Sequence, residues 1–296
     1  MSVKKDSRAD ATLHRAAITG DVTLCRSVLD SGRVHVDCAD QEGTTPLILA
    51  AANGHLACVK ELIQQGADAS RRRKQTGATS VFFAAQGGHV EVLRYLLRHG
   101  GRPDLVTADG ATALFVASQC GHVVCVRELL QASASVHLRM KDRSTPLFLA
   151  AQNGHREVAA LLTAAGADPQ QARVDGATPL WIAAQMGHSR VVQHLLKAGT
   201  HVDTPRHDGA TALFKAAHKG HVEVIRALLR YSPSLAILPN GESALHAAAM
   251  FGHVTAVQLL LEAGSRPELT NAEGLTPAEL ALQAGFDSVA ATLATQ

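Results

Sequence analysis

Aromatic residues are scarce in this sequence, at 3% of 296 residues, although hydrophobic residues as a whole make up 46%. A core with so few rings must be built mainly from Ala, Leu and Val, which favours closely packed helices over a β-sandwich. No apolar run approaches the ~18 residues of a membrane-spanning helix. The N-terminal sequence "MSVKKDSRADATLHRAA" has no apolar core of the kind that a signal peptide needs. We therefore expect a cytoplasmic protein without a membrane span, with the nucleus as the alternative compartment.

An excess of charge of one sign and a cysteine framework are also missing. The net charge is +2 and charged residues are 18% of the chain, which gives no indication of nucleic-acid or membrane binding. The five cysteines are scattered and form no Cys-x-x-Cys pair. Such a set indicates reduced, half-buried thiols in a cytosolic protein better than it indicates disulfides or a zinc site.

Sequence signatures of catalysis do not occur. The chain has no His-x-x-x-His pair, Gly-x-Ser-x-Gly elbow, P-loop or Gly-x-Gly-x-x-Gly motif. Seven of the sixteen histidines share one repeat position. Stacked helix pairs would hold them ~8–10 Å apart, whereas metal ligands converge to ~2.0–2.2 Å from one ion. We expect no enzyme activity, no catalytic residue, no cofactor and no bound metal.

The sequence does contain a repeat of about 33 residues. A Gly-His pair occurs seven times, with steps of 34, 33, 33, 33, 33 and 32 residues. A run such as "GATPLWIAA" precedes each pair and a run such as "VEVLRYLLRHG" follows it. Thr before Pro predicts a helix N-cap with Pro at N1, and the Gly predicts a left-handed helix end. The spacing of Val and Leu predicts a second helix, at whose start the histidine is expected to bond the local backbone.

This pattern resembles the ankyrin repeat from about Thr12 to Leu293. "TLHRAAITGD" is similar to an N-terminal unit, and "GLTPAELALQAGF" to a polar-faced C-terminal cap. The resemblance implies an all-α solenoid of stacked helix-turn-helix units with short hairpin-like turns, about nine units including two atypical ends. We predict a disordered tail over residues 1–8 and a single solenoid domain over residues 9–293, made of an N-terminal unit (9–42), full units (43–273) and a cap (274–293).

The chain departs from the family's motif at two positions. Only His14 and His246 keep the histidine that usually follows Pro-Leu, and five of the ten aromatic residues stand at that position instead: Phe82, Phe115, Phe148, Trp181 and Phe214. We predict that these rings pack on one another as a ladder, with a half-exposed stripe that binds a partner as the alternative. Glycine is also lost: Arg143 replaces the turn glycine, and Ser133 and Ser232 replace the glycine that closes the second helix. Each loss predicts either a strained left-handed backbone or a changed turn.

The resemblance implies protein binding through a concave face formed by the turns and the first helices. The two residues after each Ala-Ala form a row on that face, and four successive glutamines there have amides suited to a peptide backbone. Large apolar residues near the end of the row indicate a hot spot, with packing against the neighbouring cap as the alternative. The candidate partner-binding residues are Gln86, Gln119, Gln152, Gln185, His218, Asn153, Met186, Lys219, Met250 and Phe251.

Basic residues gather on the predicted turns. They would form a rim that steers acidic or phosphorylated ligands, and solvated turn tips are the alternative. Because no aromatic residue is interleaved with them, we expect no nucleic-acid partner. The candidate rim residues are Arg71, Arg72, Arg73, Lys74, Arg139 and Lys141.

The sequence as a whole predicts a monomeric, non-enzymatic scaffold or adaptor that binds a protein partner and takes no small-molecule substrate. Two alternatives stay open. One is an array with no native partner, either purely structural or engineered. The other is a binder of acidic or phosphorylated ligands through the basic turn rim.

Overall fold

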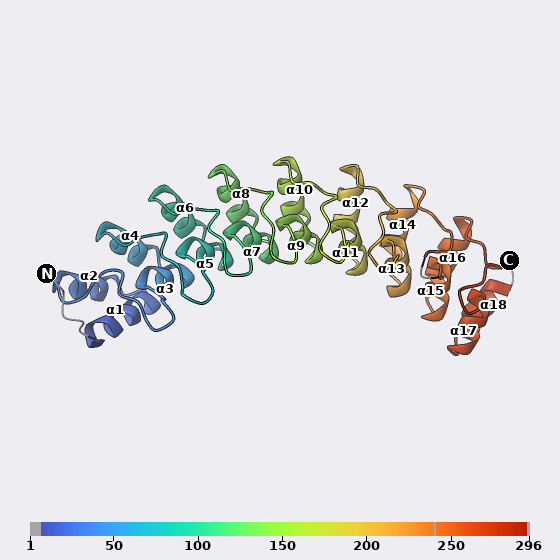
Figure 1. Ribbon diagram of the computed structural model, residues 1–296, viewed down its shortest axis with the longest axis horizontal. Coiled ribbons are helices and arrows are strands. Elements are labelled where there is room, and N and C mark those ends of the chain that lie inside the picture. Colours follow the sequence, from blue (N-terminus) through green and yellow to red (C-terminus); the bar gives the residue numbers. More distant parts are fainter. Residues whose placement is uncertain (1–6, 240, 295–296) are drawn as a thin grey trace. The chain divides into compact units, whose positions relative to one another are not determined.

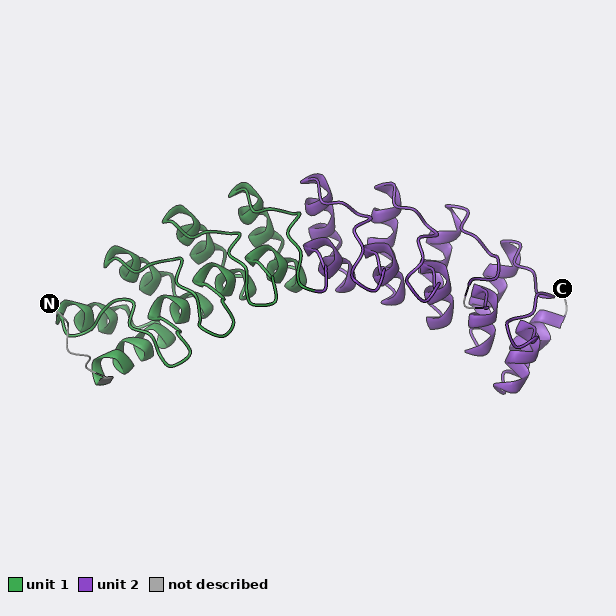
Figure 2. Ribbon diagram, in the orientation of Figure 1, with its two compact units in different colours: residues 1–141 green, residues 142–296 purple. Residues whose placement is uncertain are grey.

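The computed structural model describes residues 7–239 and 241–294. These residues form eighteen helices and no strand, in repeated pairs, which confirms the predicted all-α repeat class (Figure 1). The chain divides into two compact units, residues 1–141 (unit 1) and residues 142–296 (unit 2), drawn in separate colours in Figure 2.

Unit 1 is a stack of four helix pairs. Consecutive first helices contact one another, and so do consecutive second helices, which gives the unit two helical layers. The first helices are α1 (Ser7–Thr19), α3 (Pro46–Ala52), α5 (Ser80–Gln86) and α7 (Ala113–Cys120). The second helices are α2 (Val22–Asp30), α4 (Leu56–Gln64), α6 (Val90–Arg98) and α8 (Val123–Gln131).

Unit 2 has the same two-layer arrangement built from five helix pairs. The first helices are α9 (Pro146–Gln152), α11 (Pro179–Gln185), α13 (Ala212–Lys219), α15 (Ala244–Met250) and α17 (Pro277–Gln283). The second helices are α10 (Arg156–Ala164), α12 (Ser189–Lys197), α14 (Val222–Leu229), α16 (Val254–Glu262) and α18 (Asp287–Ala294).

The capping residues that the sequence predicts lie at the ends of the observed helices. The Thr45 hydroxyl accepts a hydrogen bond from the Ile48 amide at 3.3 Å, with Pro46 at the start of α3. The Gly121 residue that ends α7 has a φ of 75°, in the left-handed region that suits glycine. The Ala-Ala pair that most first helices contain is buried, as at Ala50 and Ala51. Such small side chains let neighbouring helices approach closely, which accounts for a core that needs few rings.

The three positions that lack the expected glycine keep the glycine-like backbone. Ser133, Arg143 and Ser232 have φ values of 61°, 66° and 49°. The turn is therefore retained. Of the two predicted outcomes, a strained left-handed backbone or a changed turn, the structure shows the first. A side chain there costs roughly 1–2 kcal/mol.

At the N-terminus, α1 begins at Ser7, two residues inside the segment predicted as a tail, and residues 1–6 lie outside the described part. The organisation of residues 9–293 as one solenoid domain stays a prediction.

Candidate functional site

The row predicted to bind a partner lies at the ends of the first helices. In unit 1, Gln86 is the last residue of α5 and Gln119 lies in the last turn of α7, and both side chains are exposed. In unit 2, Gln152 ends α9 and Gln185 ends α11, and both are half-buried. Because neighbouring first helices contact one another within each unit, the structure brings the glutamines of each unit onto adjacent helices.

The histidines of the Gly-His pairs hold the backbone of this row. The Nε2 atoms of His122, His188 and His221 each donate to the carbonyl oxygen of a row glutamine (Gln86, Gln152 and Gln185, respectively) at 3.0 Å. The predicted bond to the local backbone is therefore wrong: the acceptor belongs to the preceding repeat. These bonds engage the main-chain oxygen of the three glutamines and do not use the side-chain amide.

The glycine of each pair makes room for that ring. A Cβ added at Gly54 would lie 2.5 Å from His89 Nδ1, closer than real Cβ contacts come. In the last repeat Phe286 takes the place of the histidine, and its ring lies against Gly252 in the same way. The Gly-His pair thus joins consecutive repeats.

Asn153 is less available for binding than the sequence predicts. Its Nδ2 donates to the Leu149 carbonyl at the end of α9, at 2.9 Å, and Asn53 makes the equivalent bond to Leu49 at 2.8 Å. Each asparagine side chain thereby satisfies a carbonyl at the end of its own helix. Met186 and Lys219, also from the second position of the row, are exposed.

Two large apolar side chains are exposed near the end of the row in unit 2. Met250 is 43% and Phe251 41% exposed. The ring of Phe251 lies 4.2 Å from that of His218, between centroids, so it packs on the preceding repeat and not only on the following one. Burial lowers the pKa of His218, and Lys215 and Lys219 lower it further. A neutral imidazole with an exposed phenyl ring forms an apolar surface at this end of unit 2.

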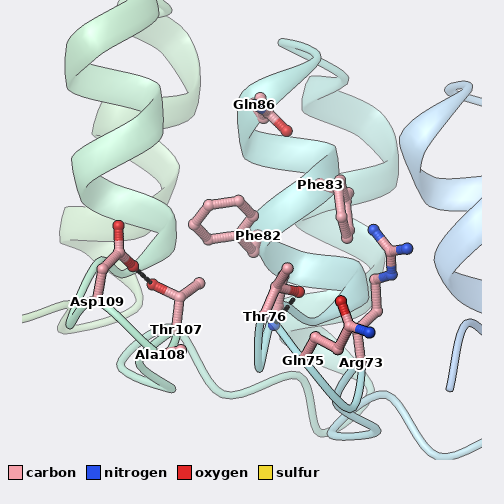
Figure 3. Close-up of a pocket in the computed structure, with 10 residues that line it drawn as sticks. Arg73, Gln75, Thr76, Phe82, Phe83, Gln86, Thr107, Ala108 and Asp109 are labelled. Atoms are coloured by element: carbon pink, nitrogen blue, oxygen red, sulfur yellow. Dashed lines mark hydrogen bonds between the residues drawn. The ribbon is translucent and has the colours of Figure 1, made fainter. Parts of the chain in front are cut away.

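Unit 1 contains a pocket of 410 Å³ where first helices meet turns (Figure 3). It is lined by Arg73, Gln75, Thr76, Ala78, Phe82, Phe83, Gln86, Thr107, Ala108 and Asp109. Phe82 and Phe83 are both half-buried, and their rings meet edge to face with centroids 5.7 Å apart. The sequence did not predict this pocket, because it needs two adjacent aromatic residues and the turn of the next repeat together.

The aromatic ladder differs from the prediction. Among the described residues no ring contact joins Phe148 to Trp181 or Trp181 to Phe214. Instead, the Arg173 guanidinium lies 5.2 Å from the Phe148 ring centroid, and that of Arg206 lies 4.9 Å from Trp181. Each ring is thus covered by an arginine from the turn of the next repeat, and the predicted ring-on-ring stack is wrong.

Phe82 is exceptional at this repeat position. The four other aromatic residues there are at most 4% exposed, namely Phe115, Phe148, Trp181 and Phe214. The alternative of a half-exposed aromatic stripe therefore applies to Phe82 alone, where the ring lines the pocket.

Three of the six candidate residues of the basic turn rim bond or pair with other groups of unit 1. Arg72 donates to the carbonyl oxygens of Gly77 and Val106, and Arg73 pairs with Glu42. Arg71 lies 3.8 Å from a carboxylate oxygen of Asp37. The remaining rim candidates are exposed, namely Lys74, Arg139 and Lys141. The three arginines thus stabilise the turns, and Lys74, Arg139 and Lys141 are left to meet a ligand.

Four of the five thiols are enclosed. Burial is the largest effect that raises the pKa of Cys25 and of Cys38 to about 12 and that of Cys125 to about 11. Cys120 is exposed. A protonated, buried thiol is a poor nucleophile and a poor metal ligand. Within residues 7–239 and 241–294, no three His, Cys, Asp or Glu side chains converge on a position for a metal ion. In that same part of the chain, every helix is too short or too polar to cross a membrane.

Comparison with known proteins gives a family match over most of the chain. The family described as "Ankyrin repeats (3 copies)" matches residues 13–107, 60–140, 82–173, 125–206, 165–237, 180–271 and 232–296. Among individual relatives, Ankyrin repeat domain-containing protein 29 is 49% identical over 68 residues in Danio rerio and 50% identical over 68 residues in Homo sapiens. Alpha-latrocrustotoxin-Lt1a of Latrodectus tredecimguttatus is 37% identical over 68 residues.

Each of these alignments covers 23% of this chain. They span 23% of the length of the two domain-containing proteins and 5% of the toxin. Three features predict the similarity to Ankyrin repeat domain-containing protein 29: the aromatic form of the motif, "SGRVHVDCAD" and "SPSLAILPNGESALHAA". The comparison confirms this similarity over 23% of the chain.

Proposed function

Because the chain belongs to the ankyrin-repeat family, whose repeats generally mediate protein–protein interaction, we propose that it is a non-enzymatic scaffold or adaptor. It binds a protein partner through the face formed by the first helices and the turns. The observation that carries this proposal is the unit 1 pocket, where two half-buried phenyl rings lie beside an exposed glutamine. Rings at this repeat position elsewhere are fully packed, so the opening at Phe82 is a local feature.

The pocket suits one apolar side chain of a partner segment. Phe82 and Phe83 supply apolar walls, and Gln86 supplies an amide at the edge that can both donate to and accept from a peptide backbone. Asp109 and Thr107 form the polar side, where the Thr107 hydroxyl donates to the Asp109 carboxylate (Figure 3). Since the His122 ring fixes the Gln86 carbonyl, the site is held in place before binding, which limits the entropy cost of association.

A second contact surface in unit 2 is proposed from the exposed pair Met250 and Phe251. Apolar side chains of this size, surrounded by polar ones, are typical of binding hot spots. The glutamines Gln152 and Gln185 lie on earlier first helices of the same unit and would add polar contacts.

Affinity capture from cell lysate tests the proposal. We expect the wild-type chain to retain a protein that is lost when Gln119, Gln152, Gln185 and Phe251 are all changed to Ala, or when Phe83 alone is changed to Ala. A hot-spot ring contributes about 2 kcal/mol or more, which is a loss of roughly thirtyfold in affinity. Gln131→Ala, on the second helix α8, is the matched control and should retain the partner. Equal capture by all variants would favour an array with no native partner.

We further propose that residues 9–293 act as one monomeric solenoid in the cytoplasm. Five free cysteines support a reducing compartment. Light scattering of the purified chain and imaging of a tagged copy in cells would test these two points separately, with the nucleus as the other compartment to examine.

A further inference from the structure

A second pocket, of 280 Å³, lies on the second-helix layer of unit 2 between α10 and α12. Five side chains line it: Arg156, Arg190, Gln193, His194 and Lys197. The four residues from α12 have i, i+3, i+4 and i+7 spacing, so they share one face of that helix. Every lining residue is basic or an amide donor, and no carboxylate is among them.

The cations of this pocket are not neutralised by ion pairs. Among the described residues, Arg156, Arg190 and Lys197 make no salt bridge, whereas Arg26 of α2 and Arg94 of α6 in unit 1 do. Like charges held together on one surface repel one another, and an anion placed among them relieves that repulsion. Burial, followed by Arg156 and Lys197, lowers the pKa of His194. Only the part of the lowering that comes from Arg156 and Lys197 reflects positive charge near the ring.

Two of the three equivalent places in unit 1, between α2 and α4 and between α6 and α8, contain a carboxylate at this repeat position. Arg26 on α2 pairs with Glu61 on α4 at 2.7 Å, and Arg94 on α6 pairs with Glu128 on α8 at 2.6 Å. These glutamates each come six residues after the histidine of a Gly-His pair, and His194 stands at that same position in α12. The repeat position at which Glu61 and Glu128 neutralise an arginine therefore carries an imidazole in α12.

A second charge is reversed on the same helix. Arg190 stands two residues after its Gly-His histidine, where the repeats before and after have Glu157 and Glu223. Ala160 takes the place that Arg94 has in unit 1, so the usual ion pair lacks both members between α10 and α12. Two independent positions thus depart from the repeat in the direction that suits an anion.

The ring of His194 is held at the pocket by the neighbouring helix. The Thr163 hydroxyl on α10 donates to the Ala159 carbonyl at 3.0 Å and lies 2.9 Å from His194 Nε2, so it accepts a hydrogen bond from that nitrogen. With the ring held in this way, the donors that line the pocket are the guanidinium groups of Arg156 and Arg190, the Gln193 amide and the Lys197 ammonium.

We propose that the pocket between α10 and α12 binds a phosphate group with two or more negative charges, carried by a small molecule or by a lipid headgroup. Guanidinium forks match phosphate oxygens in a bidentate way. Three cations exceed what a single carboxylate balances, which favours a phosphate. The pocket is smaller than the ~300–1,000 Å³ of ordinary small-molecule sites, so it suits the charged group itself. The site lies on the second helices, away from the face proposed to bind protein.

Calorimetric titration with inorganic pyrophosphate tests the proposal, at near-physiological salt of about 0.15 M. We expect saturable binding with a stoichiometry of one. His194→Glu installs the carboxylate that unit 1 tolerates at this position, and it should weaken binding by at least about tenfold, since a charge-assisted contact is worth ~1.5–3 kcal/mol. Arg156→Gln should weaken it by a similar factor. Thermal melting confirms that each variant is folded.

Arg98→Gln is the matched control, because Arg98 lines the corresponding pocket between α6 and α8 together with Glu128. It removes one positive charge from the chain but none from the proposed site, and binding should be unchanged. No pyrophosphate binding in calorimetry, together with no lipid-dependent sedimentation in the vesicle assay below, would overturn the proposal. So would an Arg98→Gln loss equal to that of Arg156→Gln, or a His194→Glu chain that binds as tightly as wild type.

The source of the phosphate is distinguished by a vesicle assay. Phosphatidylcholine vesicles with and without phosphatidylinositol 4-phosphate are sedimented with wild-type protein and with His194→Glu. Wild-type sedimentation that depends on the phosphorylated lipid and is lost in His194→Glu assigns a headgroup. Pyrophosphate binding with no sedimentation assigns a free small molecule. Lipid-dependent sedimentation that His194→Glu leaves intact, without pyrophosphate binding, would contradict the site.

Discussion

The indole Nε1 of Trp181 donates a hydrogen bond of 2.9 Å to the carbonyl oxygen of Ala210, in the turn of the next repeat. His246 reaches the equivalent carbonyl of Leu275 with its Nε2 atom at 3.2 Å, and His14 reaches that of Thr44 at 3.0 Å. Trp181 therefore replaces the family's usual histidine in function as well as in position. The phenylalanines at this repeat position have no donor for that bond.

Replacing Trp181 with Phe should lower the free energy of unfolding. The variant loses a buried hydrogen bond, worth about 1 kcal/mol, while the Ala210 carbonyl keeps the Arg206 amide as a donor. Trp181→His keeps a donor at the position and should recover part of the loss despite its smaller ring. Urea denaturation measures both. A Trp181→Phe chain as stable as wild type would show that the bond contributes nothing.

Replacing Ser133 with Gly should stabilise unit 1. Ser133 has a φ of 61°, and glycine adopts that conformation without the Cβ penalty of roughly 1–2 kcal/mol. Ser135→Gly, two residues further in the same turn, is the control and should not stabilise, because Ser135 is not among the residues with positive φ. The melting temperatures of the two variants give the comparison. Stabilisation by both to the same extent would assign the effect to something other than backbone strain.

The stability of unit 2 should fall as the pH drops below about 6.5, the ordinary pKa of histidine. Burial lowers the pKa of His246, so the unfolded chain takes up a proton at a pH where the folded chain does not. Proton uptake by the unfolded state reduces the free energy of unfolding. His246→Gln should flatten this acid limb in denaturation curves measured between about pH 7 and pH 5. If the acid limb of His246→Gln keeps the wild-type slope, groups other than His246 cause the loss of stability.

Alkylation should distinguish Cys120 from the four other cysteines. Its thiol is exposed, whereas burial raises the pKa of Cys25, Cys38 and Cys125, as it also does for Cys58. Only the thiolate reacts readily. Brief treatment of the folded chain with iodoacetamide near neutral pH should modify Cys120 alone, as mass spectrometry of tryptic peptides reports. The denatured chain, in which all five should react, is the control. Modification of Cys25 in the folded chain would contradict its burial.

Much of the fold could be predicted from the sequence because the relevant forces are local. A Thr before Pro determines a helix start, and a Gly determines a left-handed helix end. The positions of Ser133, Arg143 and Ser232 could be predicted to be exceptional because the repeat itself supplies the comparison.

The contacts between repeats could not be read in the same way. The acceptors of His122 and His188 lie 36 residues earlier in the sequence, in backbone that the motif does not describe. Arg173 and Arg206 also stand on turns, where basic residues were predicted to form a rim, and in the structure they cover aromatic rings. Both cases depend on how far one turn advances over the preceding helix pair, which the period of the sequence does not encode.

The candidate site was predictable only in part. The row position of Gln86 followed from the repeat, and the structure places it at an exposed helix end. The pocket beside it depends on the adjacent rings of Phe82 and Phe83, which meet edge to face and are both half-buried. The adjacent aromatic residues Phe82 and Phe83 are visible in the sequence and could have indicated this pocket, but a comparison of repeat positions alone does not reveal it.

A photo-cross-linking measurement tests the central claim most directly, namely that the first-helix face of unit 1 binds a protein partner. A benzophenone amino acid is placed at Gln86, beside the pocket, or at Gln131, on α8 in the second-helix layer. Each chain is irradiated in cell lysate, and cross-linked proteins are identified by mass spectrometry. The account predicts a protein cross-linked from position 86 and not from position 131, and lost when Phe83→Ala is added. No cross-link from position 86, or the same proteins from both positions, would contradict it.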